Sequence, residues 1–367
     1  MRVLITTDAV GGVWQFSHEL AAGLLREGSS VALVSFGGSP ATEQQQKCVH
    51  LASEYEREFL YESSSLPLEW MQQNEGAYHD AAPVLVRIAK DFRADLLHLN
   101  QFCFGALPLE IPKVVTAHSD VLTWAEACRD EPLENSPWLR QYRRLVADGL
   151  NGASVVIAPT RWMMNALHRH FPLRARTAVI PNGRAIPHTT NITRRLRAIT
   201  AGRLWDEAKD IRILADVSSP FPLYVAGEIR HEGSHSPTRL GSATLLGRLP
   251  QDELLRFFGE SAIYICTSRY EPFGLAPLEA ALCGCAVVAR DIPSLREVWN
   301  DAARYFSDPQ SLSEVLHECA HDQESLHAAQ RRSQTRAQCF TAERMVTGYR
   351  AEFTRMLNEA EARSYAA

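Results

Sequence analysis

Residues 267–297 read TSRYEPFGLAPLEAALCGCAVVARDIPSLRE and carry the most informative pattern in the chain. Its two glutamates, Glu271 and Glu279, flank the predicted start of a short helix. The Pro-Phe-Gly run after Glu271 keeps the backbone out of a helix, whereas Pro277 suits a first helical turn because its φ is fixed and its missing N–H is not needed there. The pattern predicts a helix of about two turns that ends at Gly284, with Glu271 on the preceding loop and Glu279 in the first turn.

A helix start of this kind is a ready binding site for an anion. It offers unpaired backbone N–H groups, here those of Phe273, Gly274 and Leu275, and the positive end of the helix dipole. Two carboxylates beside it would repel a phosphate unless the ligand also carries hydroxyl groups, from which Glu271 and Glu279 can accept hydrogen bonds. A sugar nucleotide carries both phosphates and hydroxyls, so the pattern favours such a ligand.

The same stretch resembles the signature of the retaining glycosyltransferases of family 4, which have the GT-B fold. The resemblance is carried by EPFGLAPLEA, in which seven residues separate Glu271 from Glu279, and by CGCAVVARDIPSLREV after it. It implies that Glu279 holds the ribose hydroxyls of a nucleotide, that Glu271 contacts hydroxyls of the transferred sugar, and that the amides between them lie near the diphosphate. The alternative is an ordinary strand, loop and helix with a surface glutamate on each side.

The composition of the whole chain is that of a globular protein. Its 367 residues predict two domains at ~150 residues per domain. A formal net charge of −5 lacks the basic excess of a nucleic-acid-binding protein, so no nucleic acid partner is expected. The eight cysteines stand mostly in apolar contexts without metal-ligand spacing, which predicts buried free thiols and no metal site.

No part of the chain has the pattern of a targeting or membrane-spanning segment. The N-terminus, MRVLITTDAVGG, reads as a strand and shows no cleavage site of a signal peptide. A run of ~18 uninterrupted apolar residues is missing as well. The Arg- and Trp-rich stretch 124–150 is diluted by acidic residues, which favours a solvated helix face over a membrane-surface helix. We expect a cytoplasmic protein with at most peripheral membrane contact.

The N-terminal half has the alternation of strands and helices of a doubly wound sheet. It opens with a strand at residues 2–7, a Gly11-Gly12 turn and a helix over 14–26. A dinucleotide-binding loop would need G-x-G-x-x-G and an acid at the end of the second strand; both are missing, so no NAD or other cofactor is expected. A later strand ends near His118, which places this histidine on the edge where such sheets bind ligands.

The resemblance assigns roles to these N-terminal residues. It implies that the loop at Gly11 and Gly12 lines a cleft near the sugar and the acceptor, and that His118 contacts the donor sugar. The alternatives are a tight turn that merely joins a strand to a helix, and a histidine that is hydrogen-bonded for structural reasons only.

Two cations follow the first strand of the C-terminal half. Arg203 stands at the end of RAITAGRL, and Lys209 comes six residues later. They suit two phosphates, Arg through its bidentate fork and Lys as a point charge. They resemble the pair with which the family grips the diphosphate. The run WDEAKD lacks the glycine that usually follows the lysine, so a surface lysine is the alternative for Lys209.

The expected architecture is α/β with the GT-B fold, that is, two doubly wound Rossmann-like domains that face a cleft. We expect the N-terminal, acceptor-side domain over residues 1–187 and the donor-binding domain over 188–344, with a linker at 187–195. A C-terminal helix at about 345–367 is expected to cross back onto the first domain.

The resemblance implies a retaining transfer of a sugar from a nucleotide-diphosphate sugar to an acceptor hydroxyl, in glycan or glycoconjugate biosynthesis. UDP-glucose is the commonest donor in the family, and a glycan, a lipid-linked molecule or a small molecule is the acceptor. The resemblance also implies a metal-independent reaction, in which Arg203, Lys209 and the amides near Phe273 neutralise the leaving diphosphate. The sequence has no Asp-x-Asp motif. Two alternatives are a non-catalytic sugar-nucleotide-binding protein and another enzyme on this fold, such as an epimerase or a phosphorylase.

Overall fold

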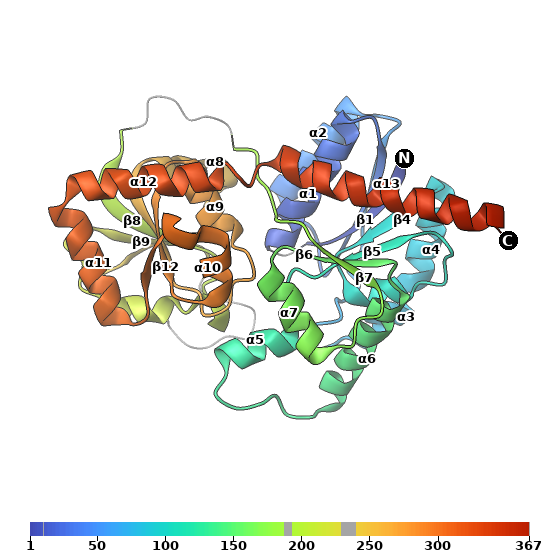
Figure 1. Cartoon of the computed structure of the whole chain (residues 1–367), viewed down its shortest axis with the longest axis horizontal. Helices are drawn as coiled ribbons and strands as arrows, with labels where there is room; N and C mark the ends of the chain where they lie inside the picture. The colour runs from blue at the N-terminus through green and yellow to red at the C-terminus, as the bar shows by residue number, and fades with distance from the viewer. Residues whose placement is uncertain (10, 187–192, 229–239, 367) are drawn as a thin grey trace. The chain divides into compact units, whose positions relative to one another are not determined.

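The computed structural model divides into two compact units, each with helices around a parallel sheet (Figure 1). It describes residues 1–9, 11–186, 193–228 and 240–366. Unit 1 comprises Met1–Ala125, Asp130–Gly183 and Ala342–Ala367, and unit 2 comprises Glu126–Arg129 and Arg184–Thr341. Most of the linker expected at residues 187–195 lies outside the described residues.

Unit 1 is built on a parallel sheet that has, among the described residues, seven strands in the order β3-β2-β1-β4-β5-β6-β7. The strands are β1 (Arg2–Asp8), β2 (Ser30–Phe36), β3 (Phe59–Ser63), β4 (Leu96–Leu99), β5 (Lys113–Thr116), β6 (Val155–Ala158) and β7 (Arg176–Val179). The order reverses between β1 and β4, where Val3 pairs with Val31 on one side and with Leu96 on the other. The carboxyl ends of β1 and β4 therefore mark the place where sheets of this topology bind ligands.

Two apolar layers cover the faces of this sheet. The helices of unit 1, among the described residues, are α1 (Gly12–Arg26), α2 (Thr42–Glu54), α3 (Gly76–His79), α4 (Ala81–Phe92), η1 (Phe102–Ala106), the first part of α5 (Val121–Cys128), α6 (Pro137–Gly152), α7 (Arg161–His170) and α13 (Ala342–Ala366); the end of α5, from Glu126, belongs to unit 2. The C-terminal helix α13 packs on α1 so closely that a Cβ at Gly23 would lie 2.3 Å from a methyl group of Val346. The C-terminal helix thus returns to the N-terminal unit, as predicted.

Unit 2 repeats the topology with six strands among its described residues, in the order β10-β9-β8-β11-β12-β13. The strands are β8 (Arg195–Ala201), β9 (Leu223–Ala226), β10 (Thr244–Gly247), β11 (Ser261–Cys266), β12 (Ala286–Arg290) and β13 (Arg304–Phe306). The helices are η2 (Glu207–Lys209), η3 (Ile211–Asp216), α8 (Gln251–Gly259), α9 (Leu275–Leu282), α10 (Pro293–Trp299), η4 (Asn300–Ala302), α11 (Pro309–His321) and α12 (Gln323–Ala337). All pairings in both sheets are parallel, which confirms the predicted doubly wound α/β class.

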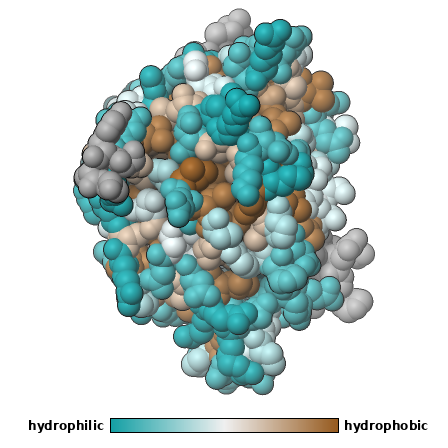
Figure 2. Space-filling model, turned by 90° about the vertical axis from the view of Figure 1, so that its right-hand side faces the viewer, coloured by the Kyte–Doolittle hydropathy of each residue, from teal (hydrophilic) through white to brown (hydrophobic). Residues whose placement is uncertain are grey.

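The surface and the thiols also bear on the sequence predictions. Hydrophilic residues surround smaller hydrophobic areas on the face shown in Figure 2. Within the described ranges, no helix is both long and apolar enough to cross a membrane.

All eight cysteines are free thiols; six of them are buried, while Cys128 is part-exposed and Cys339 exposed. The prediction of mostly buried free thiols is therefore confirmed.

Candidate functional site

The strand order of unit 2 brings together residues that lie far apart in the sequence. It reverses between β8 and β11, so the segments after these two neighbouring strands share one edge of the sheet. Arg203 and Lys209 follow β8, and Glu271 follows β11. Topological reversals of this kind are where doubly wound sheets bind ligands. Three of the predicted site residues therefore lie where the fold alone places a site.

Lys209 and Glu271 form an ion pair at this edge. The Lys209 Nζ lies 2.5 Å from the Glu271 Oε2, and the two side chains are 22% and 14% exposed. The Ser268 hydroxyl donates to the same carboxylate oxygen at 3.1 Å. One oxygen of Glu271 is thus held by two donors. Although no glycine follows Lys209, its side chain is mostly buried and paired with Glu271.

The backbones of the two loops are joined as well. The Thr267 hydroxyl donates to the Lys209 carbonyl oxygen at 2.5 Å, and the Arg269 N–H donates to the Ala208 carbonyl oxygen at 2.8 Å. These bonds fix the loop after β11 against η2. The position of Lys209 relative to Glu271 is therefore set by main chain and side chain together.

Lys209 is charged in this environment. Burial alone would lower the pKa of its ammonium group. The charge of Glu271 and the hydrogen bond to it raise this pKa by more than burial lowers it, so the pKa lies above the usual lysine value. The charge of Arg203 acts in the opposite direction, toward a lower pKa of Lys209. The two cations thus lie close enough to repel each other, which an anionic ligand between them would relieve.

Arg203 is more exposed than Lys209. Its Nη2 lies 2.7 Å from the Asp206 Oδ2, and its side chain is 40% exposed. The guanidinium carbon lies 5.4 Å from the ring centroid of Trp205. The Asp206 carboxylate also accepts from the Ala208 N–H at 2.9 Å, as an N-cap of η2. The run WDEAKD therefore orients Arg203 and shapes the turn that carries Lys209.

The loop from Glu271 to α9 requires a glycine. Gly274 is the N-cap of α9, with φ 91° and ψ 85°, and a Cβ at this position would lie 2.8 Å from Pro277 and 3.2 Å from Glu271. Phe273 is buried against Phe340, with 5.4 Å between the ring centroids. The first N–H groups of α9, which begins at Leu275, lack partners within the helix.

Glu279 differs from the prediction in two respects. It is the fifth residue of α9 and so lies in the second turn, because the left-handed Gly274 starts the helix at Leu275. Its Oε1 also accepts from the Arg184 Nε at 2.7 Å, with both side chains less than 10% exposed. Buried charges need such partners. Arg184, which directly follows the Pro-Asn-Gly run at residues 181–183, was not among the predicted site residues.

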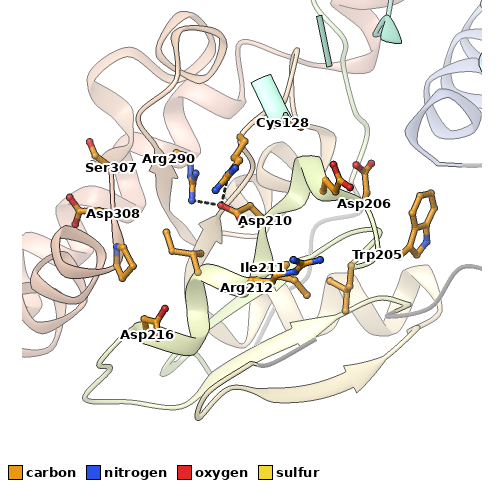
Figure 3. Close-up of a pocket in the computed structure, with 15 residues that line it drawn as sticks. Cys128, Trp205, Asp206, Asp210, Ile211, Arg212, Asp216, Arg290, Ser307 and Asp308 are labelled. Carbon is orange, nitrogen blue, oxygen red and sulfur yellow. Dashed lines mark hydrogen bonds and ion pairs between the residues drawn. The ribbon is translucent and has the colours of Figure 1, made fainter. Parts of the chain in front are cut away.

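A polar hollow of about 530 Å³ lies beside this loop system in unit 2 (Figure 3). Trp205 and Asp206 line it together with Asp210, whose Oδ2 accepts from Arg269 at 2.9 Å and from Arg290 at 2.7 Å. Within the described ranges, no group of three or more His, Cys, Asp or Glu side chains is arranged to hold a metal ion. This hollow was not predicted from the sequence, in which the run WDEAKD stood out only for the missing glycine after Lys209.

The remaining predicted residues lie at the carboxyl edge of the sheet of unit 1. Gly11 is the N-cap of α1, with φ 80° and ψ −157°, and Gly12 is the first residue of the helix. His118 follows β5 by two residues, and its ring lies edge-on to Phe16 with 4.5 Å between centroids. Burial lowers the pKa of His118 to about 3, so its imidazole is neutral at physiological pH.

The comparison with known families agrees with this architecture. Residues 10–186 match the model of Glycosyltransferase Family 4, and residues 240–336 match that of Glycosyl transferases group 1. The chain belongs to glycosyltransferase family 4. The first match contains His118 and the second contains the Glu-x7-Glu motif, so the two matches include residues from both the N-terminal and the C-terminal part of the resemblance.

Curated relatives of this family 4 glycosyltransferase match only in part. The serotype-specific mannosyltransferase WbdA of Escherichia coli is 30% identical over 119 residues, which are 30% of this chain and 15% of the relative. The alpha-maltose-1-phosphate synthase of Mycobacterium tuberculosis is 25% identical over 232 residues, 54% of this chain and 58% of the relative. The matches thus span 15% to 58% of the length of these two relatives.

Solved structures share the fold over nearly the whole length. Sucrose-phosphate synthase from Thermosynechococcus elongatus superposes with a TM-score of 0.77 at 15% identity, covering 98% of this chain and 100% of that chain. Anabaena HepE, in complex with UDP-glucose, gives a TM-score of 0.70 at 19% identity and the same coverage. At such identities the likeness shows the GT-B fold alone.

Proposed function

We propose that this family 4 glycosyltransferase transfers a sugar from a nucleotide-diphosphate sugar to a hydroxyl group of an acceptor, with retention at the anomeric carbon. The observation that carries the proposal is the meeting of Lys209, Glu271 and the start of α9 at the strand reversal of unit 2, with Arg203 on the same strand end. Cations and N–H groups suit a diphosphate, and a carboxylate beside them suits sugar hydroxyls.

The donor diphosphate is assigned to the cations and to the helix start. An ammonium group has three donors, so Lys209 can keep its bond to Glu271 and still donate to a phosphate oxygen. Arg203 adds a forked donor, and the N–H groups of residues 273–275 complete the anion site. These groups stabilise the charge that develops on the leaving nucleotide diphosphate.

The carboxylates of Glu271 and Glu279 are assigned to hydroxyl groups of the donor. Lys209 and Ser268 hold one oxygen of Glu271, which leaves the carboxylate oriented to accept from hydroxyl groups of the transferred sugar. Glu279 is assigned to the ribose of the nucleotide, and Arg184 fixes its orientation. Glu271 acts as a binding group in this scheme, without a covalent sugar intermediate, and the new bond forms on the face that the nucleotide leaves.

Unit 1 is assigned to the acceptor side and to part of the donor sugar. His118 and the loop at Gly11 and Gly12 stand at the carboxyl edge of its sheet, where doubly wound folds bind ligands. A neutral His118 can accept from a sugar hydroxyl, whereas an imidazolium ion could not. The Gly11 backbone, in a conformation that other residues rarely adopt, allows a ligand to approach the main chain closely.

We infer that the donor is a UDP-sugar such as UDP-glucose and that the reaction belongs to glycan or glycoconjugate biosynthesis. The UDP-glucose complex of the Anabaena neighbour and the hexose chemistry named for two partial relatives support this inference. The acceptor is a glycan, a lipid-linked molecule or a small molecule. No metal is needed, because Arg203, Lys209 and the α9 start take its place at the diphosphate.

The test begins with a thermal-shift screen of UDP, GDP and ADP and of their glucose and mannose conjugates. A ligand at 100 times its dissociation constant stabilises the folded state by about 2.7 kcal/mol, which is readily measured. Donors that bind are then assayed for release of the nucleotide diphosphate, and the anomeric configuration of the product is read by proton NMR. Binding without sugar release or transfer would favour a non-catalytic sugar-nucleotide-binding protein, and an inverted product would contradict retention.

A further inference from the structure

The neutral imidazole of His118 has two ring nitrogens with opposite roles. One carries a proton and donates, and the other has a lone pair and accepts. Which ring nitrogen carries the proton is set by the hydrogen-bonding partners of the ring. In unit 1 this partner is Asn100, whose Oδ1 lies 2.7 Å from the His118 Nε2.

Asn100 is itself held in one orientation by β1 and α1. It directly follows β4, and its backbone N–H donates to the Thr6 hydroxyl at 3.1 Å. Its Nδ2 donates to the Thr6 carbonyl oxygen at 2.6 Å and to the Ser17 hydroxyl at 3.0 Å. A main-chain carbonyl oxygen can only accept, so the NH₂ end of the amide must face Thr6. The oxygen end must therefore face His118.

This orientation decides the protonation of the ring. Because the Asn100 Oδ1 can only accept, the His118 Nε2 must donate to it and must carry the proton. The Nδ1 is then an acceptor. Burial keeps the pKa of His118 at about 3, so the ring does not take a second proton near neutral pH.

We propose that Asn100 is a positioning residue that fixes His118 as the Nε2–H tautomer and so presents Nδ1 as a hydrogen-bond acceptor to a ligand hydroxyl. The chain of bonds runs from the hydroxyl to Nδ1, from Nε2–H to Asn100, and from Asn100 to the Thr6 carbonyl oxygen. Groups that only accept, such as phosphate oxygens, are disfavoured at Nδ1. The identity of the hydroxyl as one of the sugar rests on the proposed function, whereas the tautomer does not.

The tautomer is measured directly on the full chain without any donor. Histidine is labelled with ¹⁵N, and two-bond ¹H–¹⁵N correlation spectra record which ring nitrogen of each histidine is protonated; the His118→Gln variant identifies the His118 signals. We expect the Nε2–H pattern for His118, unchanged between pH 6 and pH 8. An Nδ1–H pattern in the unaltered protein, or a second protonation in this range, would overturn the proposal.

Variants of Asn100 separate positioning from a general structural role. In Asn100→Ser the fixed acceptor is lost, and we expect His118 to show both tautomers. In Asn100→Asp the carboxylate favours the imidazolium ion, so the pKa of His118 rises and the ring begins to titrate at higher pH than in the unaltered protein. The matched control is Asn165→Ser on the exposed face of α7, which should leave the His118 spectrum unchanged. An Asn100→Ser spectrum with the native tautomer alone would contradict the role of Asn100.

The kinetic consequence is examined once a donor is known. We expect Asn100→Ser to lower kcat/KM roughly tenfold, the loss of about one well-placed hydrogen bond. We expect Asn100→Asp to show transfer that declines as the pH falls through the raised pKa of His118, whereas the unaltered enzyme stays flat there. Failure to find any donor would leave the NMR result intact, so the two proposals fail separately. A flat pH profile for Asn100→Asp with normal turnover would overturn the role in transfer.

Discussion

Arg184 and Glu279 form a buried ion pair within unit 2, with 2.7 Å between Nε and Oε1 and less than 10% exposure of either side chain. The two residues are 95 positions apart in the sequence. A carboxylate that is to bind ribose hydroxyls must stay ionised in a buried place, and an arginine in contact with it achieves this. The pair therefore links the stability of unit 2 to its proposed nucleotide site.

Removing only the arginine should destabilise the protein strongly. Arg184→Met leaves the Glu279 carboxyl buried without this partner, which typically costs about 3–5 kcal/mol in the free energy of unfolding. Without the arginine charge the buried Glu279 carboxyl should have a raised pKa, so the loss should be larger at pH 8 than at pH 5. Urea unfolding at the two pH values measures both effects. The double variant Arg184→Met/Glu279→Gln should recover part of the loss; no recovery would mean that the pair is not the source of the effect.

Removing the glutamate should weaken nucleotide binding in the folded protein. Glu279→Ala removes the charged group that is proposed to accept hydrogen bonds from the ribose hydroxyls. Such bonds are worth roughly 1.5–3 kcal/mol in the binding free energy of a free nucleotide diphosphate. Isothermal titration calorimetry below the unfolding temperature of the variant measures this loss. Glu253→Ala, at an exposed position of α8, is the matched control. An unchanged affinity for the nucleotide would rule out the ribose assignment.

The two cations should matter more for transfer than for folding. Each of Arg203→Ala and Lys209→Ala removes a proposed donor to the leaving diphosphate, and one such donor typically contributes about 10²- to 10³-fold to kcat. Their effect on the free energy of unfolding should be much smaller, as measured by urea titration. Arg355→Ala removes an exposed ion pair on α13 and should leave transfer unchanged. Normal turnover of the Lys209 variant would assign its role to another residue.

Transfer should not depend on a divalent metal. If Arg203, Lys209 and the first N–H groups of α9 stabilise the departing diphosphate, exhaustive treatment with EDTA should leave the initial rate unchanged. The rate is measured with the donor found in the binding screen, before and after chelation. Loss of transfer that is restored by magnesium or manganese would contradict this scheme and would point to a metal held by acidic groups.

Glu69 should make the stability of unit 1 depend on pH. This carboxyl is buried, with Oε1 accepting from the Phe102 N–H at 2.8 Å, and burial raises its pKa from 4.5 to about 7. Between pH 4.5 and about 7, the folded state then binds more protons than the unfolded state. The contribution of Glu69 to the free energy of unfolding is therefore present at low pH and is lost as the pH rises through about 7. Each unit of pKa difference corresponds to about 1.4 kcal/mol.

The variant Glu69→Gln keeps an oxygen that can accept from Phe102 but cannot ionise. Between pH 5 and pH 8, the free energy of unfolding of the unaltered protein should therefore fall relative to that of the variant. Urea titrations across this range measure the difference. Parallel curves for the two proteins would show that the Glu69 carboxyl does not carry a raised pKa.

Local patterns in the sequence were enough to predict these elements and the family. The strand at residues 2–7, the helix over 14–26 and the loop-to-helix step after Glu271 follow from local apolar periodicity and from proline and glycine, which act within a few residues. The Glu-x7-Glu motif is likewise local, so it was readable without any structure.

The partners of the predicted site residues became visible only in the folded chain. Lys209 meets Glu271 across 62 positions because β8 and β11 are neighbours in the sheet, and His118 meets Asn100 because β4 lies beside β5. The start of α9 depended on the left-handed backbone of Gly274, which placed Glu279 a turn later than predicted. Contacts between distant residues depend on the order of the strands in each sheet, and apolar periodicity along the chain predicts which residues are buried but not that order.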